Sequence, residues 1–196
     1  ALRLAAEVPV CPPARALEIS QDRLTEKTFL NAHGLETAPF HAVDDVEGLR
    51  EALKSFGGKG VLKTTRLGYD GKGQALITDA GDAAAAFRDL GGKSLILEGF
   101  IAFEREISVI AARGRDGSLS AYDPSENIHR NGILATSSLP ARISPETAEA
   151  ARQSAFAILE GLNYAGVLGV EFFVLADGAL LVNEIAPRVH NSGHWT

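Results

Sequence analysis

The stretch from Glu171 to Glu184, EFFVLADGALLVNE, places two apolar runs on either side of an Asp-Gly pair at residues 177–178. An Asp-Gly pair between such runs is typical of a two-residue β-hairpin turn, so the stretch predicts two antiparallel strands. In the register that this turn sets, Phe172 lies opposite Asn183, and the next pair outward is Glu171 with Glu184. Like charges directly opposite each other destabilise a sheet. The hairpin therefore needs an interaction that offsets the repulsion between the two carboxylates.

Three arrangements would compensate such a pair. One carboxylate takes a proton, each finds an arginine or lysine, or both bind a cation. Asn183, directly before Glu184, completes a set of hard oxygen ligands of the kind that Mg²⁺ prefers. The alternative without a metal is a salt bridge from Glu184 to Arg188, just beyond the strand. The register alone leaves both interpretations open.

Composition narrows the class of protein. A hydrophobic fraction of 45% and a charged fraction of 22% are typical of globular proteins, and the net charge of −6 gives no overall basic field for nucleic acid or an anionic membrane. No apolar run approaches the roughly 18 residues of a membrane-spanning helix. The single cysteine, Cys11, forms no internal disulfide and fits a reducing compartment. Because the chain lacks Met and a secretory signal, and stops after a polar loop, we interpret it as a piece of a longer protein.

The remainder of the chain mixes helical and strand-like segments. Periodicity and capping residues predict helices at residues 20–32, with Ser20 as N-cap, at 46–56, at 83–90 and from Ser144 onward. Runs rich in β-branched and apolar residues predict strands at 61–66, 75–78, 94–101 and 105–113. Several strands follow one another through short turns, so the sequence predicts an α+β fold of two lobes with mostly antiparallel sheets.

A glycine-rich loop, GYDGKGQ at residues 68–74, follows the strand that contains Lys63. Glycines let backbone N–H groups approach an anion closely, and Lys72 adds positive charge. The loop matches neither a P-loop nor a dinucleotide-binding fingerprint. Its alternative interpretation is an exposed hairpin tip with a solvated lysine.

Three further cations have two interpretations each. Arg23 and Lys27 lie four residues apart on a predicted helix, where like charges repel, and Lys63 lies in the middle of an apolar strand. They either face an anionic ligand or are ordinary surface residues, with Arg23 and Lys27 paired to neighbouring acids and Lys63 pointing outward from an edge strand.

Several polar groups flank the remaining strands. Glu98 ends one strand and Glu106 begins the next, so the connector between them offers backbone groups and carboxylates that would suit an adenine and its ribose. Two further clusters are hydrogen-bonding candidates for a small polar ligand, or ordinary turn residues. Their members are Glu126, Asn127 and His129, and then Arg188, His190, Asn191 and His194.

The order of these features is more specific than any one of them. It resembles the ATP-grasp superfamily, through Lys27, Lys63, the glycine-rich loop, Glu98, Glu106, Glu171 and the pair Asn183-Glu184. Within that superfamily, four runs are similar to the 5-(carboxyamino)imidazole ribonucleotide synthases of purine biosynthesis: LKTTRLGYDGKGQ, FEREISVIAARG, ENIHRNGIL and NEIAPRVHNSGHWT. The resemblance extends over essentially the whole chain.

The resemblance implies a role for each matching residue. Lys27 and Lys63 would contact the phosphates of ATP, with Arg23 nearby. The loop that would fold over the phosphates contains Gly68, Gly71, Lys72, Gly73 and Gln74. The adenine would meet Glu98, Gly99, Phe100 and Ile101, and the ribose would meet Glu106. Glu171 and Glu184 would hold Mg²⁺, supported by Asn183. The residues facing bicarbonate and 5-aminoimidazole ribonucleotide would be Tyr69, Asp70, Arg188, His190 and Asn191, with His129 as a further candidate.

The resemblance also implies an organisation and a function. The expected division is a segment from a preceding domain at 1–19, a helical part at 20–58, a small lobe at 59–100 and a large lobe at 101–196. The expected activity is ATP- and bicarbonate-dependent carboxylation of the ribonucleotide, with ATP and Mg²⁺ (two ions, or Mn²⁺ instead) as cofactors. A cytoplasmic homodimer that binds neither nucleic acid nor membrane is implied. The alternatives are another ATP-grasp carboxylase or ligase, similar to biotin carboxylase or the formate-dependent glycinamide ribonucleotide transformylase, and a nucleotide-binding module without catalysis.

Overall fold

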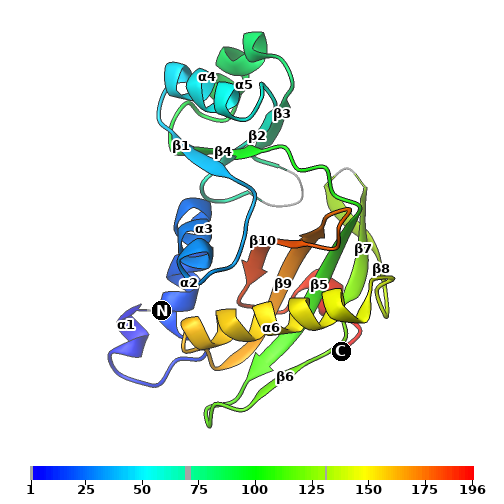
Figure 1. Cartoon of the computed structure of the whole chain (residues 1–196). Helices are drawn as coiled ribbons and strands as arrows, with labels where there is room; N and C mark the ends of the chain where they lie inside the picture. The colour runs from blue at the N-terminus through cyan, green and yellow to red at the C-terminus, as the bar shows by residue number, and fades with distance from the viewer. Residues whose placement is uncertain (1, 69–71, 131) are drawn as a thin grey trace.

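Two lobes, each built on one sheet, make up the computed structural model, which describes residues 2–68, 72–130 and 132–196 (Figure 1). The small lobe has a four-stranded antiparallel sheet with the order β1 (Phe40–Val43), β4 (Leu95–Gly99), β2 (Gly60–Thr64), β3 (Gln74–Ile77). It is covered by α4 (Val46–Ser55), the 3₁₀ turn η1 (Ala80–Asp82) and α5 (Ala83–Asp89). Leu49 and Leu53 of α4 pack against Leu62 and Leu97 of the sheet, so this lobe has a hydrophobic core of its own.

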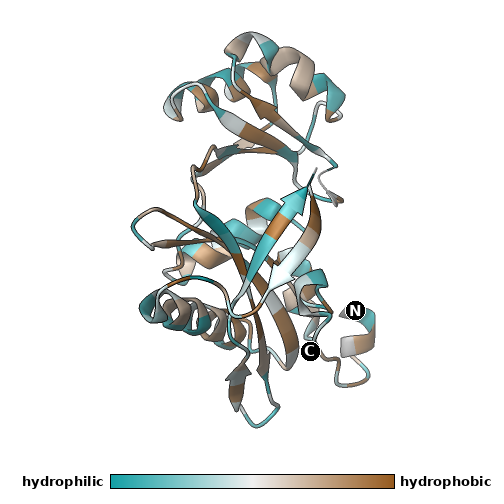
Figure 2. Ribbon diagram, turned by 90° about the vertical axis from the view of Figure 1, so that its right-hand side faces the viewer, coloured by the Kyte–Doolittle hydropathy of each residue, from teal (hydrophilic) through white to brown (hydrophobic). Residues whose placement is uncertain are grey.

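The large lobe is built on a six-stranded sheet. Its order is β10 (Leu180–Ala186), β9 (Gly166–Val174), β5 (Arg105–Arg113), β7 (Ser125–Arg130), β8 (Ile133–Ser138), with β6 (Leu119–Ala121) paired to β5. The long helix α6 (Pro145–Gly161) crosses the sheet and buries Ala151, Ala155 and Ile158 against it (Figure 1). The other elements of this lobe are α1 (Leu2–Ala5), α2 (Ala14–Ser20), α3 (Arg23–Ala32) and the 3₁₀ turn η2 (Asn191–Gly193). Apolar residues follow the strands of both sheets in Figure 2.

The α+β, two-lobed, mainly antiparallel fold that the sequence predicts is confirmed. Helix α6 begins as predicted, with the Ser144 hydroxyl accepting the N–H of Thr147 at 3.1 Å. The predicted start of the helix at 20–32 is wrong. Ser20 ends α2, which the sequence did not predict, and Asp22 caps α3 by accepting the N–H of Thr25.

The boundary between the lobes also differs from the expected one. Strand β1 and helix α4 were assigned to the helical part at 20–58, but β1 pairs with β4 and α4 packs into the small-lobe core. Helix α3 packs Phe29 and Leu30 into the large-lobe core instead. The physical reason is that the chain crosses between the lobes earlier, at residues 36–39. There the N–H of Val182 on β10 donates to the carbonyl of Glu36 at 2.8 Å, and Thr37 forms a parallel bridge with Val182.

The hairpin of β9 and β10 pairs Glu171 with Glu184 as predicted, but through a different register. The loop has three residues rather than two, because Leu175 donates its N–H to the carbonyl of Ala179 at 2.9 Å. Gly178 takes a φ of +85°, as expected in such a loop. Phe172 therefore faces Val182 and not Asn183, and a bulge between Val182 and Glu184 restores the carboxylate pair.

No helix within the described parts of the chain is long and apolar enough to cross a membrane.

Candidate active site

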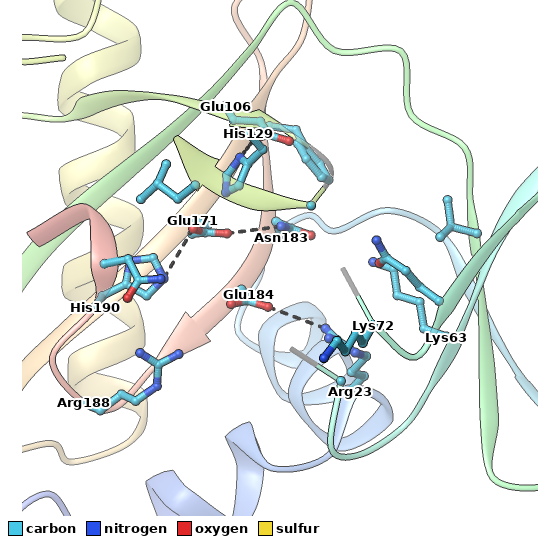
Figure 3. Close-up of a pocket in the computed structure, with 17 residues that line it drawn as sticks. Arg23, Lys63, Lys72, Glu106, His129, Glu171, Asn183, Glu184, Arg188 and His190 are labelled. Atoms are coloured by element: carbon cyan, nitrogen blue, oxygen red, sulfur yellow. Dashed lines mark hydrogen bonds and ion pairs between the residues drawn. The ribbon is translucent and has the colours of Figure 1, made fainter. Parts of the chain in front are cut away.

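A cavity of about 360 Å³ lies between the lobes (Figure 3), within the usual size range of about 300–1,000 Å³ for ligand sites. The small-lobe side contributes Val61, Lys63, Gly68, Lys72 and Gln74. The large-lobe side contributes Arg23, Glu106, His129, Gly132, Leu134, Glu171, Phe173, Asn183, Glu184, Arg188, His190 and Asn191. The predicted site residues Tyr69, Asp70 and Gly71 lie outside the described residues.

Glu171 and Glu184 form the centre of the large-lobe side, where β9 and β10 hold them directly opposite each other. Potential ligand atoms of Glu171, Glu184 and His190 all lie within 4.8 Å of one another. Burial and the neighbouring carboxylate of Glu184 raise the pKa of Glu171 to about 7. A divalent cation would remove this repulsion, and carboxylate oxygens are ligands that Mg²⁺ prefers. The residues present therefore fit the predicted metal site.

The bulge in β10 explains why two consecutive residues face the same cavity. Successive side chains of a regular strand point to opposite faces of the sheet, whereas a bulge inserts a residue and re-aims its side chain. Asn183 and Glu184 both line the cavity, and the Asn183 amide lies 3.5 Å from Oε2 of Glu171. Asn183 is thus placed beside the carboxylate pair, as expected of a supporting group.

Arg23, at the start of α3, forms an ion pair with Glu184. Its Nη1 lies 3.6 Å from Oε2 of Glu184. The alternative salt bridge from Glu184 to Arg188 is not formed in the described structure, because the guanidinium of Arg188 donates to the carbonyl of Val189 at 2.8 Å instead. Arg188 still lines the cavity and points into it in Figure 3.

Lys27, Lys63 and Glu98 form a charged triad, in which Lys27 and Glu98 are buried and Lys63 is partly exposed. Nζ of Lys63 lies 2.9 Å from Oε2 of Glu98, and Nζ of Lys27 lies 3.5 Å from the same oxygen. Burial alone would raise the pKa of Glu98, but the two ammonium groups outweigh it and lower that pKa. Burial lowers the pKa of Lys27, whereas Glu98 opposes this shift. Lys63 reaches the cavity and the other two lie behind it.

The rest of the predicted adenine contacts lie where the chain returns to the large lobe. Gly99 donates its N–H to the carbonyl of Pro39 at 2.8 Å, and Phe100 is exposed, with Nζ of Lys59 at 3.4 Å from its ring centroid. Glu98 is engaged by the two lysines, and its Oε1 atom is buried without a hydrogen-bond partner among the described residues. Contact of this segment, including Ile101, with an adenine stays a prediction.

The glycine-rich loop connects β2 to β3 at the cavity, where Gly68, Lys72 and Gln74 line the wall. The φ of Gly73 is +72°, and a Cβ atom there would come within 2.8 Å of the Thr64 hydroxyl. Position 73 therefore requires glycine on two counts, backbone conformation and space.

Glu106 and His129 face each other across β5 and β7. The imidazole Nδ1 of His129 forms a short hydrogen bond with Oε2 of Glu106. This hydrogen bond, opposed by partial burial, raises the pKa of His129. Both residues line the cavity, so the structure brings together two predicted site residues from separate strands. The contact of Glu106 with a ribose stays a prediction.

The loop after β10 brings Arg188, His190 and Asn191 to the cavity wall. His190 is buried, with Nε2 at 3.4 Å from Oε1 of Glu171, and burial lowers its pKa. His194 is exposed and is not among the described residues that line the cavity.

Two candidates from the earlier polar cluster have structural partners instead. Glu126 binds the guanidinium groups of Arg105 at 3.1 Å and Arg142 at 3.2 Å. Asn127 is buried and bonded to Ser108 and Ser137. Of the three candidates in this cluster, only His129 is among the described residues that line the cavity.

Glu26 is a buried acid, although one of the two interpretations of Arg23 and Lys27 made it one of their neighbouring surface acids. Its Oε1 accepts the N–H of Ile185 at 3.3 Å, which ties α3 to the strand that carries Glu184. Burial, followed by the Glu184 carboxylate, raises the pKa of Glu26 to about 8. The sequence pattern does indicate this burial. Glu26 lies three residues before Phe29 and four before Leu30, so it shares the buried face of the helix with them.

Two lobes that enclose a cavity lined by lysines, a glycine-rich loop and a carboxylate pair define a nucleotide-binding architecture. The model of the ATP-grasp domain family matches residues 28–196, and the chain belongs to this family.

Individual proteins that are similar to this chain narrow its place within the family. The chain is 59% identical over 196 residues to the N5-carboxyaminoimidazole ribonucleotide synthase of Brucella melitensis, covering 99% of this chain and 54% of that protein. The structure of the N5-carboxyaminoimidazole ribonucleotide synthetase of Thermus thermophilus superimposes with a TM-score of 0.92 at 48% identity, covering 100% of this chain and 52% of that one. The synthase of Aspergillus clavatus, solved with ADP and 5-aminoimidazole ribonucleotide, gives a TM-score of 0.91 at 26% identity, covering 98% and 51%. The chain thus spans about half the length of the relatives that it matches.

Proposed function

We propose that the protein uses ATP and bicarbonate to carboxylate 5-aminoimidazole ribonucleotide, giving 5-(carboxyamino)imidazole ribonucleotide for purine biosynthesis. The observation that carries the proposal is the pairing of Glu171 with Glu184, opposite Lys63 in one cavity. That arrangement suits a metal-bound triphosphate. The choice of 5-aminoimidazole ribonucleotide as the carboxyl acceptor follows from the names of the relatives. The polar side chains of Arg188, His190 and Asn191 line the cavity and could bind such an acceptor.

The small-lobe side would bind the phosphates of ATP. Lys63, Lys72 and Arg23 bring positive charge to the cavity, and phosphoryl transfer depends mainly on positioning and charge neutralisation. Glu171 and Glu184 would hold Mg²⁺ with support from Asn183, and the cation would neutralise charge that develops on the phosphate oxygens. Two ions, or Mn²⁺ in place of Mg²⁺, are compatible with these oxygen donors.

The reaction would proceed in two steps. An oxygen of bicarbonate attacks the γ-phosphorus of ATP, the bond to ADP breaks, and carboxyphosphate forms. The exocyclic amine of the ribonucleotide then bonds to the carboxyl carbon, directly or after CO₂ is released, while inorganic phosphate leaves and the amine loses a proton. Arg188 and His190 would orient the anionic reactants, and the loop at 68–74 would exclude water from carboxyphosphate.

The test of the proposal is the acceptor dependence of ADP release by the complete protein. We expect release to require 5-aminoimidazole ribonucleotide, bicarbonate and Mg²⁺ together, with one carboxylated product per ADP. Release driven instead by biotin or by glycinamide ribonucleotide with formate would assign the site to another ATP-grasp enzyme. Binding of Mg²⁺-ATP without turnover under any of these conditions would indicate a nucleotide-binding module.

The substitution Gly73→Ala is expected to raise the KM for ATP by up to about tenfold. A non-glycine residue at this φ costs on the order of 1–3 kcal/mol, and the added methyl group would collide with Thr64. The matched control is Gly91→Ala, where φ is +95° but no atom lies within 4 Å of the added Cβ. Steady-state kinetics and melting curves of both variants distinguish strain in the loop from general destabilisation. An equal change in KM for both variants would contradict the role of the loop.

The homodimer and the cytoplasmic location implied by the resemblance stay predictions. Sedimentation of the complete protein tests the first, and cell fractionation tests the second.

A further inference from the structure

A chain of buried hydroxyl groups leads from the sheet of the large lobe to His190. Ser108 on β5, Ser125 on β7 and Ser192 in η2 are each at most 1% exposed. Oγ of Ser108 lies 2.6 Å from Oγ of Ser192 and 2.9 Å from Oγ of Ser125. Oγ of Ser192 lies 2.8 Å from Nδ1 of His190. The mechanism proposed above uses none of these serines.

The hydrogen bonds of this chain are compatible with one direction, from Asn127 to His190. The amide nitrogen of Asn127 donates to Oγ of Ser108 at 3.0 Å, and its amide oxygen accepts from Ser137 at 2.8 Å. Ser108, having accepted that bond, donates its own hydrogen to Ser192. Ser192, having accepted a bond from Ser108, has its own hydroxyl hydrogen to donate to Nδ1 of His190, 2.8 Å away.

A second donor reaches the same ring nitrogen. The backbone N–H of Ser192 lies 3.4 Å from Nδ1 of His190, and this contact caps η2. A backbone N–H can only donate, so Nδ1 is the acceptor in this contact, which is the role of a ring nitrogen that carries no proton. The hydrogen bond made by one ring nitrogen decides which nitrogen is protonated.

We propose that Ser192, oriented by Ser108, is a positioning residue that holds His190 in the tautomer protonated at Nε2. Nε2 lies 3.4 Å from Oε1 of Glu171, and His190 lines the cavity. A protonated Nε2 has no lone pair for a metal ion, so the cation falls to Glu171 and Glu184. His190 then serves as a hydrogen-bond donor, to Glu171 or to an anionic oxygen of a reactant. Its use in turnover rests on the proposed function, whereas the tautomer itself does not.

The tautomer is measured directly by nitrogen NMR of the complete protein labelled with ¹⁵N-histidine, with His190→Gln identifying the signals. We expect Nδ1 to give a pyridine-like signal and Nε2 a pyrrole-like signal coupled to its proton. Addition of Mg²⁺ should leave this pattern unchanged. In Ser192→Ala the pyridine-like character of Nδ1 should be reduced. A proton on Nδ1 in the unsubstituted protein, or its appearance there when Mg²⁺ is added, would overturn the proposal.

Steady-state kinetics test whether this tautomer of His190 contributes to turnover. Ser192→Ala should lower kcat about 10–100-fold, the range found when a hydrogen-bond partner that orients a residue of a metal site is removed, with a KM for ATP within about twofold of the original. Ser192→Cys, which keeps a weak donor, should recover part of the loss. The matched control is Ser125→Ala, which removes a buried hydroxyl from the same network but outside the path from Ser108 to His190.

The outcomes separate the explanations. Equal losses of kcat and of melting temperature in Ser192→Ala and Ser125→Ala would show a structural network only and overturn the proposal. If the complete protein carboxylates no aminoimidazole ribonucleotide, the proposed function fails, and the NMR pattern still decides the tautomer.

Discussion

Glu184→Gln is expected to lower the kcat for ATP turnover about 10²–10³-fold, because a metal ion supplies several kcal/mol of transition-state stabilisation and each 1.36 kcal/mol is a factor of about ten. The same substitution should raise the melting temperature of the metal-free protein at pH 8. Glu184 is a source of the repulsion that raises the pKa of Glu171 to about 7, and glutamine removes it without changing the shape of the side chain. Activity and stability therefore move in opposite directions.

The pH dependence gives this prediction a second readout. The pKa of Glu171 is about 7 in the folded protein, against an ordinary value of 4.5. Between these values the folded state keeps a proton that the unfolded state has lost, so the stability of the metal-free protein falls as the pH rises through this window. In Glu184→Gln the decline should be smaller.

Melting curves at pH 5 and pH 8, without and with Mg²⁺, measure both effects. Glu160→Gln, on the exposed part of α6, is the isosteric control and should change neither quantity. Full turnover in Glu184→Gln would exclude the metal role of this residue, and a nucleotide-binding module would have no turnover to lose.

Glu98→Gln is expected to destabilise the protein by about 3–5 kcal/mol, the usual result of removing one partner from a buried ion pair. The amide would leave the ammonium groups of Lys63 and Lys27 without a counter-charge at 2.9 and 3.5 Å. For a domain of this size, the melting temperature would fall by roughly 10 °C.

Two further variants isolate the cause. Glu149→Gln breaks an exposed ion pair with Arg152 and should leave the melting temperature unchanged. The triple variant Lys27→Met, Lys63→Met, Glu98→Leu replaces the triad with apolar groups and should recover much of the stability, while losing the affinity for Mg²⁺-ATP that calorimetry measures. A melting temperature of Glu98→Gln within experimental error of the original would contradict the triad.

The sequence predicted the carboxylate pair, although the register in between was wrong. Alternation and the Asp-Gly signal located the hairpin, but they did not distinguish a two-residue from a three-residue loop. The bulge at Asn183 offset that one-residue difference, so Glu171 and Glu184 still met. Helix α6 was predictable because its N-cap signal is local, spanning Ser144 to Thr147.

What could not be predicted depends on contacts between distant segments. The ion pairs of Glu98 with Lys27 and Lys63 are an example, because each joins segments that are far apart in the sequence. The bond between Ser108 and Ser192 joins residues 84 positions apart. No local sequence pattern predicts a contact between two such distant residues, so it could be found only from the tertiary fold.

The connection between residue 36 and β10 has a mechanical consequence. Because the N–H of Val182 is bonded to the carbonyl of Glu36 and Thr37 bridges to the same residue, the chain that leaves for the small lobe is anchored beside Glu184. Any swing of the small lobe must pivot beyond this anchor, at residues 38–39 on one crossing and 100–103 on the other. A movement about these two crossings would change the distance between Lys63 and the carboxylate pair, while the segment at residues 36–37 would stay bonded to the strand that carries Glu184.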